Sequence, residues 1–457
     1  MDNFKDYENA EFDDERLSKR LAILLDQLAG NPSASISAAC HDPYQAKAAY
    51  RFVSNDEVTT EAITKITHDV TVGKINDARP PVLLIAQDTT EVNYSSLKET
   101  EGLGTIGRHK TALGIHVHSA VAIGETGEVF GLLAQKLWIR PVEEFGKSDS
   151  SRYKLAIEEK ESYRWLETLE KVGTCFPHGT SSVHICDREG DIFELFFKAQ
   201  EEGHQYLCRR SRVRSVLEES GLIKLDELIE SLPAAGTITV HIPRDSHKKR
   251  KERDAKVEIK FGKGSIKKPR GLVTDKEMPK YIEVYFISAV EAAPEPGQEA
   301  LSWQLITNVP TTNFDEAVTR ISWYTQRWKI ETFHRTLKSG CKVEELQSND
   351  AKKLTKLIAI YSILALQIML LSYAGRVNPD VSCEIYLTED EWKILYRVAK
   401  KTKELPEKPP TIKEAVVMIA KLGGFLGRKS DGDPGVTVMW RGLAKLYTIL
   451  DASLYLI

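Results

Sequence analysis

Two nearly continuous apolar runs of strand length, each followed by an aspartate, constrain the fold of this chain most strongly. One run spans residues 81–87 and ends at Asp88, and the other spans residues 182–186 and ends at Asp187. Strands that are apolar along their whole length are typical of sheets buried between layers of helices. Ligands collect at the carboxyl ends of such strands, so the two aspartates are candidates for one site. An aspartate after a strand is also common as a turn or helix-capping residue.

The length of 457 residues predicts two to four domains with a sizeable core. A formal net charge of -3 differs from the basic balance common in nucleic-acid-binding domains. Basic residues are nevertheless clustered in the middle third of the chain, at 209–214, 247–251 and 263–270. These clusters are either solvated surface or a track for phosphates.

Four polar or charged side chains near residue 330 form a row, spaced as on one face of a helix. Tyr324, Arg327, Glu331 and Lys338 are three, four and seven residues apart, which predicts one helix face about four turns long. A carboxylate can hold a divalent cation against a phosphate, while Arg and Lys neutralise neighbouring phosphates and Tyr donates a hydrogen bond. The alternative is a solvated helix face with an ion pair between Arg327 and Glu331.

Glu331 together with the two strand-end aspartates makes three carboxylates, which is the ligand type that one or two hard cations prefer. Such a set is typical of two-metal phosphoryl transfer. The row and the two aspartate motifs resemble the insertion-sequence-four family of bacterial DDE transposases, nearest the transposon-five transposase branch. Further landmarks of the resemblance lie in family order at 49–52, 131–133, 138–141, 159–162, 303–307 and 422–425.

The resemblance implies an α/β fold, with a ribonuclease-H-like catalytic core interrupted by a mostly β insertion and flanked by helical domains. The predicted order of strands before Asp88, near 115–123, near 129–139 and before Asp187, with a helix around 158–172, agrees with such a core. A helix from about residue 191 and a strand at 206–208 would complete it. We expect a helical DNA-binding domain at 1–72, the catalytic domain at 73–348 with its insertion at about 213–308, and a helical dimerisation domain at 349–457.

Family resemblance also implies the chemistry. Asp88, Asp187 and Glu331 are expected to hold two Mg²⁺ or Mn²⁺ ions, about 3.5 to 4 Å apart, for cleavage and strand transfer of DNA. Trp303 is expected to stack on a base flipped out of the duplex. The other residues expected to contact DNA are Tyr324, Arg327, Trp328 and Lys338 in the row, Arg188 and Arg210 near the strand ends, and Arg16, Arg20, Lys47 and Arg51 in the N-terminal domain.

The expected partners are double-stranded DNA, as terminal inverted repeats and target, and a second copy of the chain in a synaptic dimer. Six cysteines without a metal-binding spacing indicate reduced thiols, and we expect a bacterial cytoplasmic protein associated with the nucleoid. The most apolar stretch, at 357–371, is shorter than a membrane span and predicts a buried helix. Two other functions remain open: a structure-specific endonuclease, and a DNA-binding regulator without catalytic activity.

Overall fold

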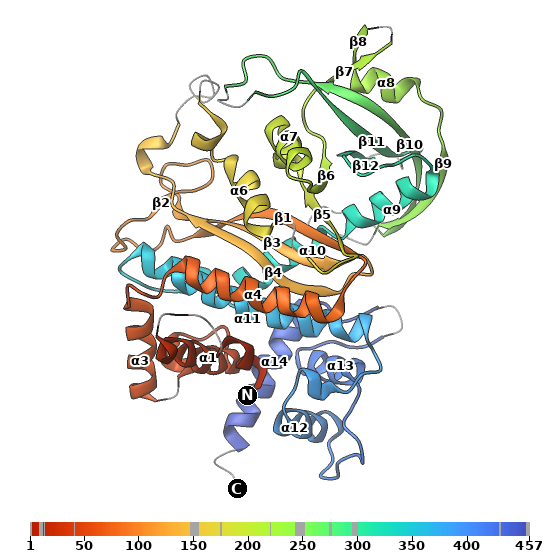
Figure 1. Ribbon diagram of the computed structural model, residues 1–457. Helices are drawn as coiled ribbons and strands as arrows, with labels where there is room; N and C mark the ends of the chain where they lie inside the picture. The colour runs from red at the N-terminus through yellow and green to blue at the C-terminus, as the bar shows by residue number, and fades with distance from the viewer. Residues whose placement is uncertain are drawn as a thin grey trace. The chain divides into compact units, whose positions relative to one another are not determined.

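The computed structural model describes residues 2–8, 12, 14–40, 42–146, 155–173, 176–219, 221–242, 252–273, 277–294, 300–428 and 431–453 (Figure 1). The chain forms two compact units. The first contains Met1–Pro80, Thr89–Phe145 and Trp328–Ile457, and the second contains Pro81–Asp88 and Gly146–Arg327. The predicted mixed α/β class with helical N- and C-terminal regions is confirmed. The predicted domain boundaries near 72 and 348 stay a prediction.

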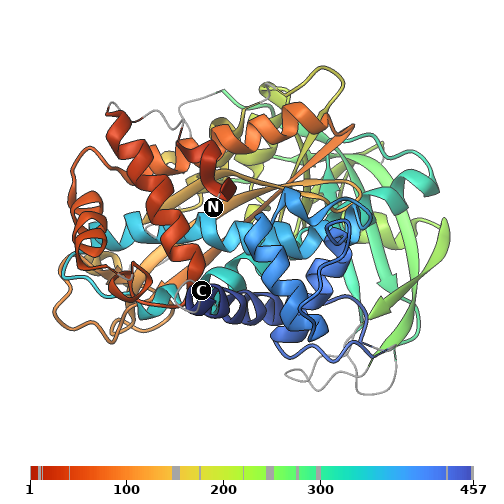
Figure 2. The same ribbon diagram turned by 90° about the horizontal axis from the view of Figure 1, so that it is seen from below.

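Helices occupy the N-terminal part of the first unit, as the sequence predicts. They are η1 (Asp2–Tyr7), α1 (Glu15–Gly30), α2 (Ile36–Ala39), α3 (Pro43–Ser54) and α4 (Thr60–Ala78). Capping side chains begin them: Asp14 accepts a hydrogen bond from the Arg16 N–H, and Asp42 accepts one from the Tyr44 N–H. Figure 2 shows α1, in dark red, beside the last helix of the chain, in dark blue.

Antiparallel strands β2 (Gly104–Thr105), β3 (Leu113–Gly124) and β4 (Val129–Trp138) form the β part of the first unit. Helices α4 and α11 both pack against β4. The approach of α4 is close, because a Cβ on Gly131 of β4 would lie 2.1 Å from Thr71 Oγ1. A glycine is therefore required where this helix crosses the strand.

The chain beyond Asn349 is helical, as predicted, with α11 (Ala351–Val377), η7 (Cys383–Ile385), α12 (Glu389–Lys400), α13 (Ile412–Leu422) and α14 (Val436–Ser453). The apolar stretch predicted to form a buried helix lies in α11. The helix is longer than that stretch, and by length and composition alone it could cross a membrane. In its most apolar window, however, 89% of the residues are buried within the structure, which is the environment of a core helix.

The second unit is built on a sheet in which residues 82–86 of β1 (Val82–Asn93) pair in parallel with β5. The order continues from β5 through β6, β12, β11, β10 and β7 to β8, with β9 beside β10. Strands β5 and β6 are parallel, and pairing is antiparallel from β6 onward. Their bounds are β5 (Ser181–Cys186), β6 (Gln205–Arg209), β7 (Ser215–Glu218), β8 (Gly221–Lys224), β9 (Gly236–Ile242), β10 (Arg253–Lys267), β11 (Tyr281–Glu291) and β12 (Ser302–Thr307).

Helices of the second unit are η3 (Ile157–Glu159), α6 (Tyr163–Val172), η4 (Arg188–Gly190), α7 (Phe193–Glu201), α8 (Leu225–Ser231) and α9 (Phe314–Thr325). The helix predicted around 158–172 is thus divided, since a turn separates η3 from α6. The expected mostly β character of residues 213–308 is confirmed for the described part of that range, which also contains the helix α8.

The hydrophobic core of this unit includes side chains of α6, α7, α8 and the sheet. Phe196 of α7 stacks on Tyr206 of β6 with ring centroids 4.6 Å apart. Helix α9 packs elsewhere on the sheet, where a Cβ on Gly236 of β9 would lie 2.4 Å from the Phe314 ring.

Candidate active site

Asp88 and Asp187 are brought together by the parallel pairing of β1 and β5. The last registered pair is Ala86 with Ile185, and each aspartate stands two residues beyond it. Neighbouring strands lie about 4.8 Å apart and side chains alternate between faces, so this equal offset puts both carboxylates level and on one face. Both residues belong to the second unit.

Asp187 also caps the short helix η4. Its Oδ1 accepts a hydrogen bond of 2.8 Å from the Glu189 N–H, and its carbonyl accepts one from the Cys208 thiol. No hydrogen bond to the second carboxylate oxygen, Oδ2, is found among the described residues. The capping role and a role as a cation ligand are therefore compatible.

Arg327 and Tyr324 supply the polar groups beside these aspartates. Arg327 Nη1 lies 3.6 Å from Asp88 Oδ2. Burial raises the pKa of Tyr324 to about 12, against the lowering effect of Arg327 and Arg209. The Tyr324 hydroxyl therefore stays protonated near neutral pH and can donate a hydrogen bond.

The prediction of one continuous helix face from Tyr324 to Lys338 is wrong. Helix α9 ends at Thr325, Gln326 and Arg327 form a turn, α10 (Trp328–Arg335) follows, and Thr336–Gly340 is π-helical. The turn is closed by hydrogen bonds from the Gln326 and Arg327 N–H groups to carbonyls three residues back. Because the turn and the wider π-helix each change the rotation per residue, the phase predicted from 100° steps is lost.

Lys338, Trp328 and Glu331 all belong to the first unit. Lys338 donates a hydrogen bond of 2.8 Å to the Glu91 carbonyl and lies 3.1 Å from Glu344 Oε1. Trp328 is 62% exposed on α10, three residues before Glu331.

Carboxylates are the candidate cation ligands of this site. Within the described ranges, no group of three or more His, Cys, Asp and Glu side chains could already hold a metal ion. The strand-end pair still fits a divalent cation chemically, because Asp88 and Asp187 are hard oxygen donors delivered from adjacent strands.

The predicted DNA contacts near the strand ends differ in availability. Arg188 is exposed, and its guanidinium makes no hydrogen bond in the part of the chain that the structure describes. Arg210, in contrast, is bound within the protein, since it forms an ion pair with Asp226 and donates to Gln304. Trp303 is partly exposed on β12, opposite Ala289 of β11.

The four residues of the N-terminal domain that are predicted to contact DNA also differ in their exposure and in their partners. The Arg16 side chain is 89% exposed but pairs with Asp14 at 2.8 Å, and Arg20 donates to Gln45. Lys47 and Arg51 of α3 line a shallow hollow of about 680 Å³. Two aromatic residues of this surface, Tyr44 and Tyr50, are 82% and 48% exposed and were not among the predicted DNA contacts. Their spacing of three residues from Lys47 was the available signal.

Of the basic clusters, residues 247–251 lie outside the described residues. In the cluster at 263–270, Lys263 pairs with Glu283 at 2.9 Å. The five cysteines within the described ranges are free thiols, as expected, and Cys175 is not among them.

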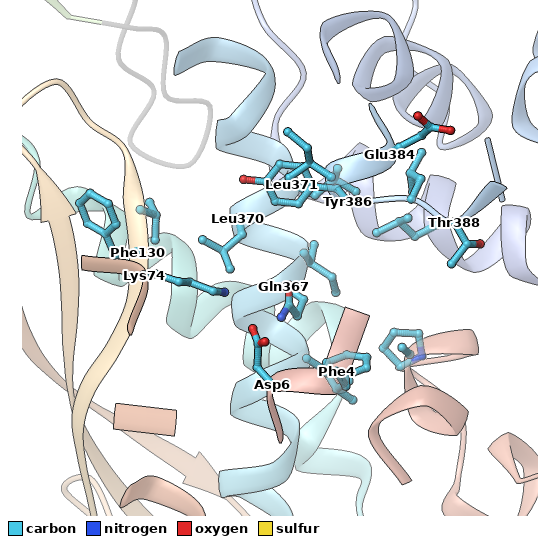
Figure 3. A pocket seen from close by; sticks show the side chains of 18 of the residues that line it. Phe4, Asp6, Lys74, Phe130, Gln367, Leu370, Leu371, Glu384, Tyr386 and Thr388 are labelled. Carbon is cyan, nitrogen blue, oxygen red and sulfur yellow. The ribbon is translucent and has the colours of Figure 1, made fainter. Parts of the chain in front are cut away.

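A cavity of about 790 Å³ lies elsewhere, in the first unit (Figure 3). Its lining includes Phe4 of η1, Lys74 of α4, Phe130 of β4 and Leu371 of α11. None of the predicted site residues lines it. The strand-end carboxylates are therefore not part of this cavity.

Comparison with protein families gives two matches, one toward each end of the chain. Residues 4–58 match the family described as Transposase DNA-binding, which covers η1 to α3. Residues 363–456 match the family described as Transposase Tn5 dimerisation domain, which covers most of α11 and the helices after it. The two matches indicate a Tn5-type transposase, and placement in the insertion-sequence-four family is consistent with them.

Proposed function

We propose that this chain is a cut-and-paste DNA transposase that cleaves DNA at terminal inverted repeats and joins the freed ends to a target. The level placement of Asp88 and Asp187 at adjacent parallel strand ends carries the proposal, because it puts two carboxylates on one face. Matches to a transposase DNA-binding family and a transposase dimerisation family support the biological setting.

The proposed catalytic core is ribonuclease-H-like. In its favour, β1, β3 and β4 are followed by α6, β5, α7 and β6 in chain order, which is the order expected of that fold. Residues from β7 to β12 form the proposed insertion. The domain limits at 1–72, 73–348 and 349–457 are part of the same proposal.

Asp88, Asp187 and Glu331 would hold the divalent cations, Mg²⁺ or Mn²⁺, two for each active site. Bound cations supply Lewis acidity, activation of a water or 3′-hydroxyl, and stabilisation of the leaving oxygen. For the two aspartates, the proposal is supported by their oxygen-donor chemistry and by the strand register. Glu331 enters by its place in the Tyr-Arg-Glu-Lys row.

The chain's own side chains orient the DNA in this scheme. Tyr324 donates a hydrogen bond as a neutral phenol, and Arg327 offsets the charge of Asp88. Arg188 and Lys338 neutralise phosphates. Trp303, together with Trp328, stacks on a flipped base, a contact worth about 1 to 3 kcal/mol.

The proposed reaction begins with a nick at the transposon end. The freed 3′-hydroxyl attacks the opposite strand to form a hairpin, a second hydrolysis opens the hairpin, and the 3′ end is joined to target DNA. Two copies of the chain form the synaptic complex, and each cuts the end bound mainly by the other. The match of residues 363–456 to a dimerisation family supports this arrangement, and the proposed location is the bacterial cytoplasm at the nucleoid.

Cleavage of a labelled duplex tests the proposal. The duplex carries the inverted repeat that flanks the gene, and Glu331→Ala is compared with Glu345→Ala, whose side chain is 66% exposed on the same unit. We expect Mg²⁺-dependent nicks and hairpins at the repeat boundary for the intact chain and Glu345→Ala. Glu331→Ala should bind the repeat without cutting it.

A chain that binds the repeat but never cuts it with Mg²⁺ or Mn²⁺ would overturn the catalytic proposal. The DNA-binding regulator would then be the function. Nicking that ignores the repeat and follows DNA structure would point instead to the endonuclease.

A further inference from the structure

The turn after β5, Asp187-Arg188-Glu189-Gly190-Asp191, is held to the rest of the second unit on two sides. Glu189 forms an ion pair with Arg164 of α6. Gly190 has no room for a side chain, since a Cβ there would lie 2.6 Å from the Cys186 Cβ. The backbone that carries Asp187 is therefore tightly constrained.

Asp191 makes the second attachment and is 1% exposed. Its Oδ2 accepts hydrogen bonds from the Ser211 N–H at 2.8 Å and the Arg212 N–H at 2.6 Å. Its Oδ1 accepts from Arg214 Nε at 3.1 Å and from Arg214 Nη2. Ser211 Oγ adds a bond of 2.9 Å to the Arg188 carbonyl. The carboxylate thus ties the segment 211–214 to the turn that begins at Asp187.

Such an arrangement needs a carboxylate. Every group that faces the two Asp191 oxygens is a donor, and an ionised carboxylate is acceptor-only, whereas an asparagine would turn an NH₂ group toward one of them. Arg214 is itself 4% exposed, so removing its carboxylate partner would leave a buried positive charge uncompensated.

The residue that this anchor presents to solvent is Arg212. Its side chain is exposed, and its guanidinium makes no hydrogen bond or ion pair within the described segments. Arg210, two residues earlier, is bound to Asp226 and Gln304. The arginine available for a phosphate on this segment is therefore Arg212.

We propose that Arg212 is a DNA phosphate-binding residue and that Asp191 is the positioning residue that holds it beside the Asp187 turn. The proposal rests on the proposed DNA cleavage, and it names a contact that the sequence had assigned to Arg210. A phosphate bound at Arg212 would be held in register with the Asp187 carboxylate through a short path of hydrogen bonds.

A double-mutant cycle tests the proposal. Asp191→Asn, Arg212→Ala and the double variant are compared for the single-turnover nicking rate at saturating DNA and for the Kd of the repeat duplex. We expect Arg212→Ala to lower the nicking rate about 10-fold and to reduce the salt dependence of binding by about one phosphate contact. Asp191→Asn should lower the rate by up to about 10-fold, because Asp191 acts through Arg212, and it should cause little further loss when Arg212 is already alanine.

Glu291→Gln is the matched control. Glu291 is also a buried carboxylate in an ion pair with an arginine, Arg253, and it also accepts a backbone N–H, from Leu301. It lies on β11, separated from β5 by β6 and β12. We expect Glu291→Gln to lose about as much thermal stability as Asp191→Asn. The folded Glu291→Gln protein should nick DNA within about 2-fold of the rate of the intact chain, and its small effect on the rate should add to that of Arg212→Ala.

Arg214→Lys is the second variant if Asp191→Asn does not fold. Lysine keeps the positive charge beside Asp191 but lacks the several N–H donors of the guanidinium group. A partial loss of the nicking rate is therefore expected. Additive effects of the Asp191 and Arg212 changes, or equal effects of Asp191→Asn and Glu291→Gln, would overturn the positioning role. An intact chain that does not cut at all would instead refute the proposed function.

Discussion

The two strand-borne aspartates and the helix-borne Glu331, which we propose as cation ligands, are fixed in different ways. Asp88 and Asp187 stand at equal offsets beyond one registered pair of parallel strands. Glu331 lies on α10, which begins only after a turn has interrupted the segment that starts with Tyr324. Parallel pairing sets the two aspartates through a ladder of backbone hydrogen bonds, and it tolerates little adjustment.

The helical segment contains two changes of geometry, the turn at Gln326 and Arg327 and the π-helix at Thr336–Gly340. A π-helical turn is uncommon and occurs often at functional sites. The comparison shows that spacing along a chain predicts a shared face reliably only where the backbone stays regular. The positions of Asp88 and Asp187 thus depend on regular strand pairing, whereas that of Glu331 depends on local irregularities of the helical segment.

Loss of a strand-borne carboxylate should have the largest effect. Asp187→Asn keeps the cap on η4 but removes the charge needed to hold a cation, so we expect nicking to fall about 10³-fold or more, with binding of DNA retained. Single-turnover cleavage with Mg²⁺ measures it. Asp254→Asn, at a side chain that is 67% exposed on β10, is the control and should cut normally. Equal rates for the two variants would remove Asp187 from the site.

A change in the helix-borne half should have a smaller effect. Lys338→Ala removes one positively charged side chain and its contacts with the Glu91 carbonyl and Glu344. We expect the nicking rate to fall about 10-fold. The same assay compares it with Lys352→Ala, which removes an exposed lysine of α11. A variant that cuts as fast as the intact chain would show that the row ends before Lys338.

The packing of α9 on the sheet of the second unit can be weakened by a change at Gly236. Gly236→Ala would press a Cβ into the Phe314 ring, so we expect a loss of about 1 to 3 kcal/mol in the free energy of unfolding. Urea unfolding measures it. Gly73→Ala in α4 has open space around its Cβ and should instead stabilise the chain by about 0.5 to 1 kcal/mol. Two losses of equal size would mean that α9 does not pack closely there.

The smallest effect is a pH dependence next to the strand ends. Burial, together with the neighbouring His204, lowers the pKa of His184 from 6.5 to about 3. The unfolded chain therefore binds a proton below pH 6.5 that the folded chain refuses, so stability is fully present above 6.5 and falls as the pH drops toward 3. The expected loss is about 1.4 kcal/mol for each pH unit below 6.5.

His184→Gln should flatten that slope, and the exposed control His109→Gln should leave it unchanged. Urea midpoints at pH 7.5 and pH 5.5 provide the comparison. An unchanged slope in His184→Gln would show that other groups dominate the acid sensitivity of this unit.

Much of the architecture could be predicted, because its signals are local. Apolar runs before Asp88 and Asp187 identified two buried strands. The interruption at Gln326 and Arg327 could not be predicted in this way. Neither residue is a helix breaker, and the turn is closed by backbone hydrogen bonds that carry no signature in residue type.

The availability of each arginine was equally hidden. Arg210 and Arg212 look alike in a basic run, yet one is bound to Asp226 and the other is exposed. Their difference arises from Asp226, 16 residues after Arg210, and from Gln304 of β12, 94 residues after it.

By itself, the sequence determined which residues could act: the apolar strands, the acidic side chains that follow them, and the row from Tyr324 to Lys338. Only the tertiary structure decided which of them share a face and which charges are already paired. The physical reason is range. Hydrophobic periodicity and capping act over a few residues, whereas strand register and buried ion pairs such as Asp191 with Arg214 depend on segments that meet only in the folded chain.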